Sequence, residues 1–467
     1  MIDPRHATAC EIAAAVASGE IAAREVIETT LACIAALDPK LNAFTSLTAE
    51  RARAKAAAID QARAAGQEIG ALAGAPFAVK NLYDIAGLTT CAGAKITRDD
   101  PPAEADAFAI HQLEKAGAIL VGALNMDEYA YGFTGENVHD GNSRNPHDPR
   151  HMTGGSSGGA AAAVASGMVA FALGTDTNGS IRVPASLCGL FGLKPTFGRL
   201  SRCGVYPFCA SLDHVGVLAR SAFDLALVYD AMQGKDSADA VCASRDAEPV
   251  LGYLRQGAKD LRIGVAGDYF RRGGRPEAFA AVDRIATALG AKRQVVLPGA
   301  QQARAAAYLI TASEGAALHL ERLRRRPSDF DPAVRDRLLA GAMLPAEIIA
   351  KAQKFRAWFR ARAAEIFEEI DVILAPATPC RAPLSGQKLM YLDGAEESVR
   401  ANLGIYTQPI SFIGLPVATV PVVARDEPLP LGVQVIGPAW REDLVLRVAH
   451  DLETRGVAGA PVASPAG

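Results

Sequence analysis

The sequence predicts an α/β protein in which a central, twisted, mixed β-sheet is flanked by helices on both faces. Short apolar segments, typical of buried strands, alternate with longer segments whose apolar periodicity is typical of helices. The chain has 467 residues, of which 50% are hydrophobic and 21% are charged, as expected for a large globular protein. No linker and no internal repeat divides it, so we expect one large domain over residues 1–467.

Two helices are predicted at the start of the chain, over residues 8–37, with a glycine between them. Thr8 and Glu11 match a capping box, in which each side chain satisfies a free backbone N–H at the helix start. Ile12 and Val16 begin an apolar stripe at helical spacing.

The remaining elements follow the same alternation of patterns. Helices are expected over 48–65, 104–117 and 160–167, after residue 221, through most of 300–370, and over 442–453. Strands are expected at 76–82, 118–122, 168–173, 261–265, 372–374, 417–423 and 431–436. Residues 134–159 are rich in Gly, Asn, His, Pro and Ser and predict a loop. The Ala/Pro/Gly-rich tail from residue 456 predicts a frayed end.

Composition excludes several classes of function. A formal net charge of −3 gives no reason to expect nucleic acid or a membrane surface as a partner. The eight histidines show no HExxH pattern and no Cys/His ligand spacing, so neither a metal nor another cofactor is predicted. The eight cysteines form no CxxC pair, and the chain opens without a signal-peptide pattern. These features predict a cytoplasmic protein with reduced thiols.

One lysine and two serines beside glycine provide the candidate chemistry. Lys80 follows the apolar run Pro-Phe-Ala-Val, Ser156 lies in Gly-Gly-Ser-Ser-Gly-Gly (154–159), and Ser180 lies in Gly-Thr-Asp-Thr-Asn-Gly-Ser-Ile-Arg (174–182). A serine hydroxyl needs a proton acceptor to become a nucleophile. Lysine can serve only when it is neutral, which requires that burial lower its pKa.

The loop 154–159 is compatible with four interpretations when it is considered alone. It has the composition of a flexible linker, and it precedes a helix, as a phosphate-binding loop does, although Gly-Lys-Ser/Thr is missing. It also fits the GxSxG nucleophile elbow, but residues 147–153 before it do not form the apolar strand which that motif requires. In the fourth interpretation the loop acts together with Ser180.

The chain resembles the amidase signature family along nearly its whole length, with the core of the resemblance at about residues 70–220. The matching segments are Lys80 after its strand, 154–159, 174–184, Cys-Gly-Leu-Phe-Gly-Leu-Lys-Pro-Thr (188–196), Gly-Arg-Leu-Ser (198–201) and Ser-Leu-Asp-His-Val-Gly (211–216). The resemblance implies the amidase signature fold, with a sheet of about ten or more strands and a helical insertion at about 300–370.

The resemblance also implies a Ser–cisSer–Lys triad that acts through an acyl-enzyme. Ser180 is then the nucleophile, Ser156 the bridging serine after a cis peptide, and Lys80 the base. The backbone amides of Thr177, Asn178, Gly179 and Ser180 are expected to form the oxyanion hole. Asn178 stands where glycine is commoner in the family, so its side chain is expected to narrow the pocket or to contact substrate.

Other residues near these motifs are assigned supporting or binding roles. We expect Asp176 and Arg182 to pair and hold the nucleophile loop, and Ser157 to be a structural neighbour of Ser156. Tyr131, Glu136 and Gly155 are candidate substrate contacts. Surface or packing roles are expected for the three histidines nearest to these motifs, which are His147, His151 and His214.

Several further stretches narrow the resemblance to one branch of the family. They are 126–133, 311–315, 329–332, 406–411 and 433–436. This branch implies hydrolysis of a small linear urea-like amide, 1-carboxybiuret, to urea-1,3-dicarboxylate and ammonia. It also implies a small helical accessory subunit, in a homodimer or heterotetramer. The alternatives are the glutaminase subunit of a tRNA-dependent amidotransferase and a broad-specificity amidase. An anionic substrate predicts a cationic or N–H-rich pocket, for which Arg182 and Arg322 are the first candidates.

Overall fold

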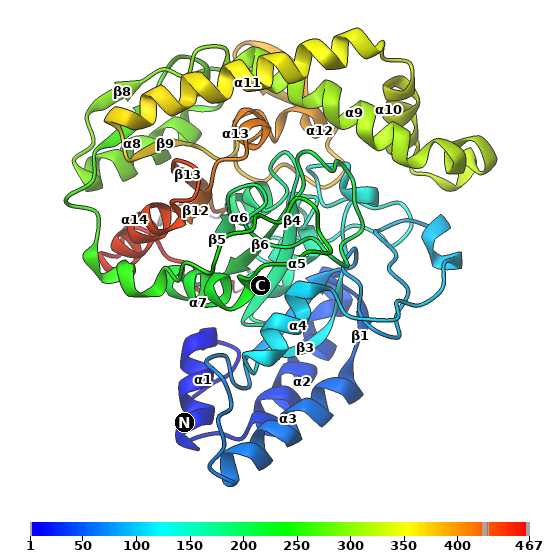
Figure 1. Cartoon of the computed structure of the whole chain (residues 1–467), viewed down its shortest axis with the longest axis vertical. Helices are drawn as coiled ribbons and strands as arrows, with labels where there is room; N and C mark the ends of the chain where they lie inside the picture. The colour runs from blue at the N-terminus through cyan, green and yellow to red at the C-terminus, as the bar shows by residue number, and fades with distance from the viewer. Residues whose placement is uncertain (1, 423–426, 428, 464–467) are drawn as a thin grey trace.

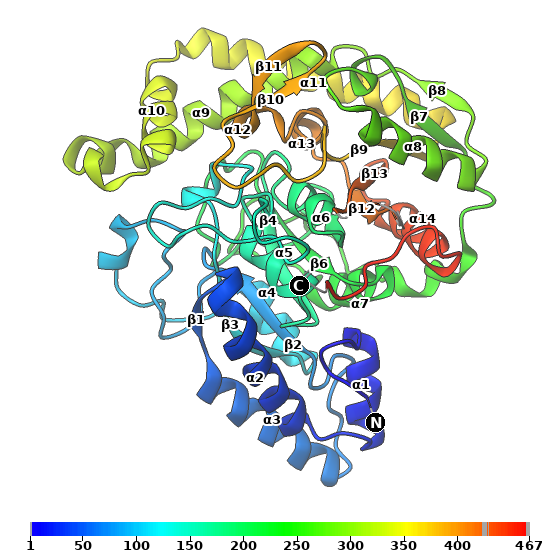
Figure 2. The same ribbon diagram turned by 180° about the vertical axis from the view of Figure 1, so that it is seen from behind.

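A single eleven-stranded sheet organises the chain in the computed structural model, which describes residues 2–422, 427 and 429–463 (Figures 1 and 2). In spatial order the strands are β1 (Phe44–Leu47), β3 (Ile119–Leu124), β2 (Pro76–Lys80), β4 (Phe171–Asp176), β6 (His214–Ala219), β5 (Phe191–Lys194), β12 (Val417–Pro421), β13 (Gly432–Ile436), β9 (Val372–Pro376), β7 (Ile263–Ala266) and β8 (Arg293–Val295). Strand β2 pairs in parallel with β3 and β4, whereas β6 pairs antiparallel with β4 and β5. The sheet is therefore mixed, as predicted.

Both faces of the sheet are covered. Every residue of β2, β3, β4 and β6 is buried. Because successive side chains of a strand point to opposite faces, such strands need cover on both sides. Helices α5 (Gly158–Ala165), α7 (Ala222–Met232) and α14 (Glu442–Thr454) are among those that pack on the sheet. The predicted α/β architecture is confirmed.

The N-terminal helices lie together at one end of the molecule, beside the β1 edge of the sheet (Figure 1). They are α1 (Ala9–Ser18), α2 (Ala23–Leu41) and α3 (Ala49–Ala64). The predicted capping box is present at Thr8 and Glu11, and Gly19 ends α1 with φ of 81°. Helix α4 (Phe108–Lys115) begins four residues later than the pattern predicts, because the Asp106 carboxylate is held outside the helix by the Arg51 guanidinium.

The predicted helical stretch at 300–370 forms three helices at the opposite end of the molecule (Figure 1). They are α9 (Ala300–Arg325), α10 (Pro332–Ala342) and α11 (Ala346–Glu369). The other helices are α6 (Arg182–Leu187), α8 (Pro276–Leu289), α12 (Val399–Asn402) and α13 (Gln408–Ile413), and β10 (Leu389–Leu392) pairs with β11 (Ala395–Ser398) in a hairpin. In the part of the chain that the structure describes, no helix combines the length and the apolar character needed to cross a membrane.

The structure corrects two predictions about element ends. Strand β4 starts at residue 171 and not 168, because Gly167 and Met168 close the preceding helix with a left-handed turn and a bond from Met168 N to Ala163 O. The tail is not frayed between 457 and 463, since Ala463 N donates to Ala165 O at 2.8 Å. Residue 423 of a predicted strand and the tail residues 464–467 lie outside the described residues.

Candidate active site

Lys80 is the last residue of β2, and its amine lies in the protein interior. Nζ donates to Ser156 Oγ at 2.7 Å and to Thr175 Oγ1 at 3.0 Å. Lys80 and Ser156 are fully buried. Burial lowers the pKa of Lys80 to about 7, despite the opposing influence of nearby carboxylates, of which Asp127 has the largest effect. A substantial fraction of this amine is therefore uncharged near neutral pH.

The loop before α5 gives Ser156 its position. The Gly155–Ser156 peptide is cis, as the family resemblance implies. A Cβ at residue 155 would lie 2.2 Å from Asp127 Oδ1, so this site requires glycine. The Gly155 amide donates to Phe133 O at 2.8 Å. Gly155 thus shapes the loop and is absent from the lining of the pocket described below.

Ser180 follows β4 in a loop whose backbone donors are free. Within the described residues, the amides of 177–180 donate no hydrogen bond. The Ser157 amide donates to Ser180 O at 3.3 Å and joins the two serine loops, while Ser157 Oγ donates to Thr175 O at 3.3 Å. Gly179 has φ of 144°, and a Cβ there would lie 2.1 Å from Thr407 Oγ1. The loop therefore offers consecutive unpaired N–H groups beside a serine hydroxyl, which is the composition of an oxyanion hole.

A buried ion pair underlies this loop. Arg182 Nη2 lies 2.9 Å from Asp176 Oδ1 and Arg182 Nε lies 2.9 Å from Asp176 Oδ2, with both side chains fully buried. Burial alone would raise the pKa of Asp176, but the Arg182 guanidinium outweighs it and holds the pKa well below its usual range. Asp176 Oδ2 also accepts from the Ile181 amide at 3.2 Å. The predicted pairing is present and ties the strand before Ser180 to the helix after it.

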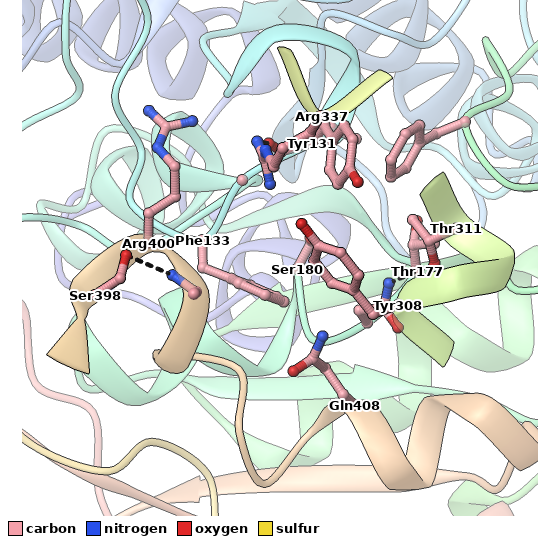
Figure 3. Close-up of a pocket in the computed structure, with 15 residues that line it drawn as sticks. Tyr131, Phe133, Thr177, Ser180, Tyr308, Thr311, Arg337, Ser398, Arg400 and Gln408 are labelled. Carbon is pink, nitrogen blue, oxygen red and sulfur yellow. Dashed lines mark hydrogen bonds between the residues drawn. The ribbon is translucent and has the colours of Figure 1, made fainter. Parts of the chain in front are cut away.

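The pocket beside Ser180 is small, with a volume of about 130 Å³, below the roughly 300–1,000 Å³ of pockets for drug-sized ligands. Its lining, part of which is labelled in Figure 3, consists of Ala130, Tyr131, Gly132, Phe133, Thr177, Asn178, Ser180, Phe208, Tyr308, Thr311, Arg337, Ser398, Arg400, Ala401 and Gln408. These residues come from loops, from the end of β11, and from α9, α10, α12 and α13. The pocket is therefore assembled from segments that are distant in sequence.

Two arginines line this pocket. Arg337 lies over the Tyr131 ring, with 3.8 Å between the guanidinium carbon and the ring centroid, and donates to Tyr131 O. Arg400 is less engaged: its Nη2 lies 3.9 Å from a Glu136 oxygen and 4.0 Å from an Asp331 oxygen. Its Nη1 is buried and has no hydrogen-bond partner among the described residues. Arg400, which lines the pocket, thus has a donor without a partner among the described residues.

The arginines expected from the sequence lie elsewhere. Arg182 is saturated by Asp176 and also donates to Gln434 Oε1 at 2.7 Å. Arg322 donates to Asp100 at 2.8 Å and to the Tyr206 hydroxyl at 3.1 Å, outside the lining of the Ser180 pocket. Neither of these two first candidates lines the pocket beside Ser180.

Of three other residues singled out from the sequence, one lines the pocket and two do not. Tyr131 lines the pocket, and its hydroxyl is buried without a partner among the described residues. Glu136 lies outside the lining and accepts from the Gly386 amide at 2.7 Å, so it fastens a loop. His214 is buried, with Nδ1 2.9 Å from Asp176 O, and has the packing role that we expected.

Sequence reasoning missed several residues of the site. Thr175, the second hydrogen-bond partner of Lys80, lies inside the motif 174–182. A search of that motif for a second hydroxyl to bind the lysine could have found it. Thr311 lies in the stretch 311–315 that narrowed the family resemblance, whereas Arg337 and Arg400 had no such signal. Arg337 and Arg400 lie on α10 and α12, far along the chain. An arginine in such a helix usually lies on the face that contacts solvent.

A serine loop with free amides beside a buried lysine is the arrangement expected of an amidohydrolase, and comparison with known proteins gives the family. The amidase family model matches residues 25–446, and the chain belongs to this family, the amidase signature enzymes. It is 51% identical to the AtzE subunit of 1-carboxybiuret hydrolase from Pseudomonas sp. (strain ADP), over 96% of this chain and 98% of that protein. It is 38% identical to the A subunit of glutamyl-tRNA(Gln) amidotransferase from Azotobacter vinelandii, over 96% of each.

Solved structures agree with this assignment. One, described as a vestigial protein complex that reveals the origins of an s-triazine catabolic enzyme, superposes with a TM-score of 0.96 at 51% identity, over 97% of this chain and 100% of that one. A crystal structure of an amidase gives 0.86 at 32% identity, over 96% and 100%. The chain is accordingly an enzyme that hydrolyses amide C–N bonds.

Proposed function

We propose that this chain hydrolyses 1-carboxybiuret to urea-1,3-dicarboxylate and ammonia. The observation that carries the proposal is the buried Lys80 amine, with its pKa lowered to about 7, at 2.7 Å from Ser156 Oγ. The 51% identity to the AtzE protein of 1-carboxybiuret hydrolase supports the choice of substrate.

The proposed chemistry begins with proton transfer. Neutral Lys80 takes the Ser156 proton while Ser156 takes the proton of Ser180, and the Ser180 oxygen bonds to the terminal carbonyl carbon of the substrate. The free amides of 177–180 stabilise the resulting oxyanion, and one such donor contributes about 3–4 kcal/mol. Return of the proton through Ser156 to the amide nitrogen breaks the C–N bond and releases ammonia. Water then attacks the acyl-enzyme, and the dicarboxylate leaves.

The anionic end of the substrate matches the charge of the pocket. A carboxylate accepts readily from a guanidinium, and Arg400 Nη1 is a buried donor without a partner among the described residues. Arg337 adds a second positive group to the same lining. These contacts support a substrate that carries a carboxylate.

The second candidate function is that of a glutaminase, because the chain is 38% identical to the A subunit of an amidotransferase. Ammonia release separates the two functions when it is measured with 1-carboxybiuret and with glutamine as substrates. We expect release from 1-carboxybiuret, and loss of that release in Ser180→Ala. Turnover of glutamine alone would reverse the assignment, and unchanged release in Ser180→Ala would remove Ser180 as nucleophile.

We further propose that the chain works with a small helical accessory subunit, in a homodimer or heterotetramer, within the cytoplasm. The solved relative is described as a protein complex, and all eight cysteines are free thiols, which suits a reducing compartment. The mass of the purified enzyme by light scattering, before and after co-expression with a candidate partner, tests the assembly.

A further inference from the structure

Asn178 is a polar side chain of the pocket whose orientation is fixed by its neighbours. Its Nδ2 donates to Thr311 Oγ1 on α9 at 2.9 Å, and its backbone oxygen accepts from Thr407 Oγ1 at 2.6 Å. It lies on the nucleophile loop, two residues before Ser180. With the amide nitrogen turned toward Thr311, the amide oxygen points elsewhere.

That oxygen, Asn178 Oδ1, is buried and has no partner among the described residues. A buried acceptor without a partner is destabilising, so this oxygen of a pocket-lining residue calls for a donor from outside the chain. The donor must be an N–H or O–H group of a bound molecule, since an amide oxygen can only accept.

Arg400 and Thr311 lie on opposite sides of Ser180 in the close-up (Figure 3). Thr311 is the residue to which the Asn178 amide donates. A substrate with its carboxylate at Arg400 and its scissile carbonyl at Ser180 directs the other substituent of that carbonyl toward Asn178. In a terminal amide this substituent is the NH₂ group that leaves as ammonia.

We propose that Asn178 Oδ1 accepts a hydrogen bond from the leaving amino group and so makes the site selective for primary amides over esters. The inference rests on the proposed function for the position of the carboxylate. Thr311 is a positioning residue, because it acts only by holding the Asn178 amide. The substrate nitrogen keeps one N–H on Oδ1 while it receives the returning proton, and the C–N bond then breaks to give ammonia.

A matched pair of substrates tests this selectivity. Succinamate and monomethyl succinate share a carboxylate and differ only in the leaving group, NH₂ or OCH₃. The measurement is the ratio of kcat/KM for ammonia release to kcat/KM for methanol release. We expect Asn178→Gly to lower this ratio by about tenfold, as for loss of one hydrogen bond at a reacting group. Glycine is the residue commoner in the family at this position, so the loop can accommodate it.

The Thr311 variants separate positioning from a general structural effect. Thr311→Val removes the hydroxyl with little change in shape and should lower the same ratio, whereas Thr311→Ser keeps the hydroxyl and should retain it. An unchanged ratio in both Asn178→Gly and Thr311→Val would overturn the inference, whether or not both rates fall, because damage to the loop affects amide and ester alike.

Binding measurements keep the inference independent of turnover. If wild-type enzyme hydrolyses neither compound, Kd is measured by calorimetry on Ser180→Ala and on Ser180→Ala/Asn178→Gly. A loss of affinity confined to succinamate supports the inference, while equal effects on both ligands, or no binding of either, overturn it. Failure of the proposed function is a different result, namely no ammonia from 1-carboxybiuret.

Discussion

At the scale of single residues, the proposed mechanism depends on the charge of Lys80. A lysine in water is protonated at neutral pH, but burial brings the pKa of this amine down to about 7. The two hydroxyls at 2.7 and 3.0 Å from Nζ are compatible with a neutral amine, because it still has two N–H groups to donate to Ser156 and Thr175 and keeps a lone pair that can take a proton.

This pKa predicts the pH dependence of catalysis. Only the deprotonated amine is a base, so kcat/KM should rise with pH through about 7 and level off above it. The profile is measured as ammonia release from 1-carboxybiuret over buffers of constant ionic strength. A profile that stays flat across this range would show that Lys80 does not titrate as the base.

Arg400 gives a second prediction at this scale. Arg400→Gln should lower kcat/KM for a carboxylate substrate by about 10- to 100-fold, since a charge-assisted hydrogen bond is lost. An uncharged amide, succinamide, should be affected much less. Arg322→Gln is the matched control, because that arginine pairs with Asp100 outside the pocket lining. Equal losses for charged and uncharged substrates would contradict the role of Arg400.

At the scale of elements, the strand–loop–helix unit around Ser180 is held by a charge pair that solvent does not reach. The pair joins Asp176 at the end of β4 to Arg182 at the start of α6. Thr407, in the segment before α13, adds a separate contact, because its Oγ1 donates to Asn178 O. Contacts from β4, α6, α9 and the segment before α13 therefore fix this loop.

Asp176→Asn should consequently destabilise the protein. Loss of one partner leaves the Arg182 charge buried, which costs about 3–5 kcal/mol in unfolding free energy. Denaturant unfolding measures the change. Glu321→Gln is the control, because it removes the carboxylate of an exposed ion pair, Glu321–Arg324. It should change the unfolding free energy by about 0.5 kcal/mol or less. A similar, small effect of both substitutions would contradict the structural role of the Asp176–Arg182 pair.

At the scale of the whole molecule, the sequence was most informative where the relevant contacts are local. The helix, strand and loop patterns predicted the α/β class, and the motif around Ser180 contains both the Asp176–Arg182 pair and Thr175. Strands β1, β5, β6, β8, β10 and β11 were not predicted, because whether such a segment forms a strand depends on the neighbours with which it pairs. The single-domain organisation and the catalytic roles stay predictions.

The binding side of the site could not be predicted in the same way. Arg337 and Arg400 reach the pocket only because α10 and α12 pack around the nucleophile loop, and no local pattern encodes that approach. Arg182 and Arg322 were the first candidates, yet Asp176 of the same motif engages Arg182 and the distant Asp100 engages Arg322. Contacts that are distant in sequence thus place Arg337 and Arg400 at the pocket and Arg322 outside its lining.

The most direct test of the central claim is to identify the serine that reacts. The enzyme is treated with a fluorophosphonate, which modifies activated serines, and the modified peptide is located by mass spectrometry. We predict one adduct, on Ser180, and its loss when Lys80→Ala removes the base. Modification of a different serine, or undiminished labelling of Ser180 in Lys80→Ala, would contradict the claim that a buried, uncharged lysine activates this nucleophile.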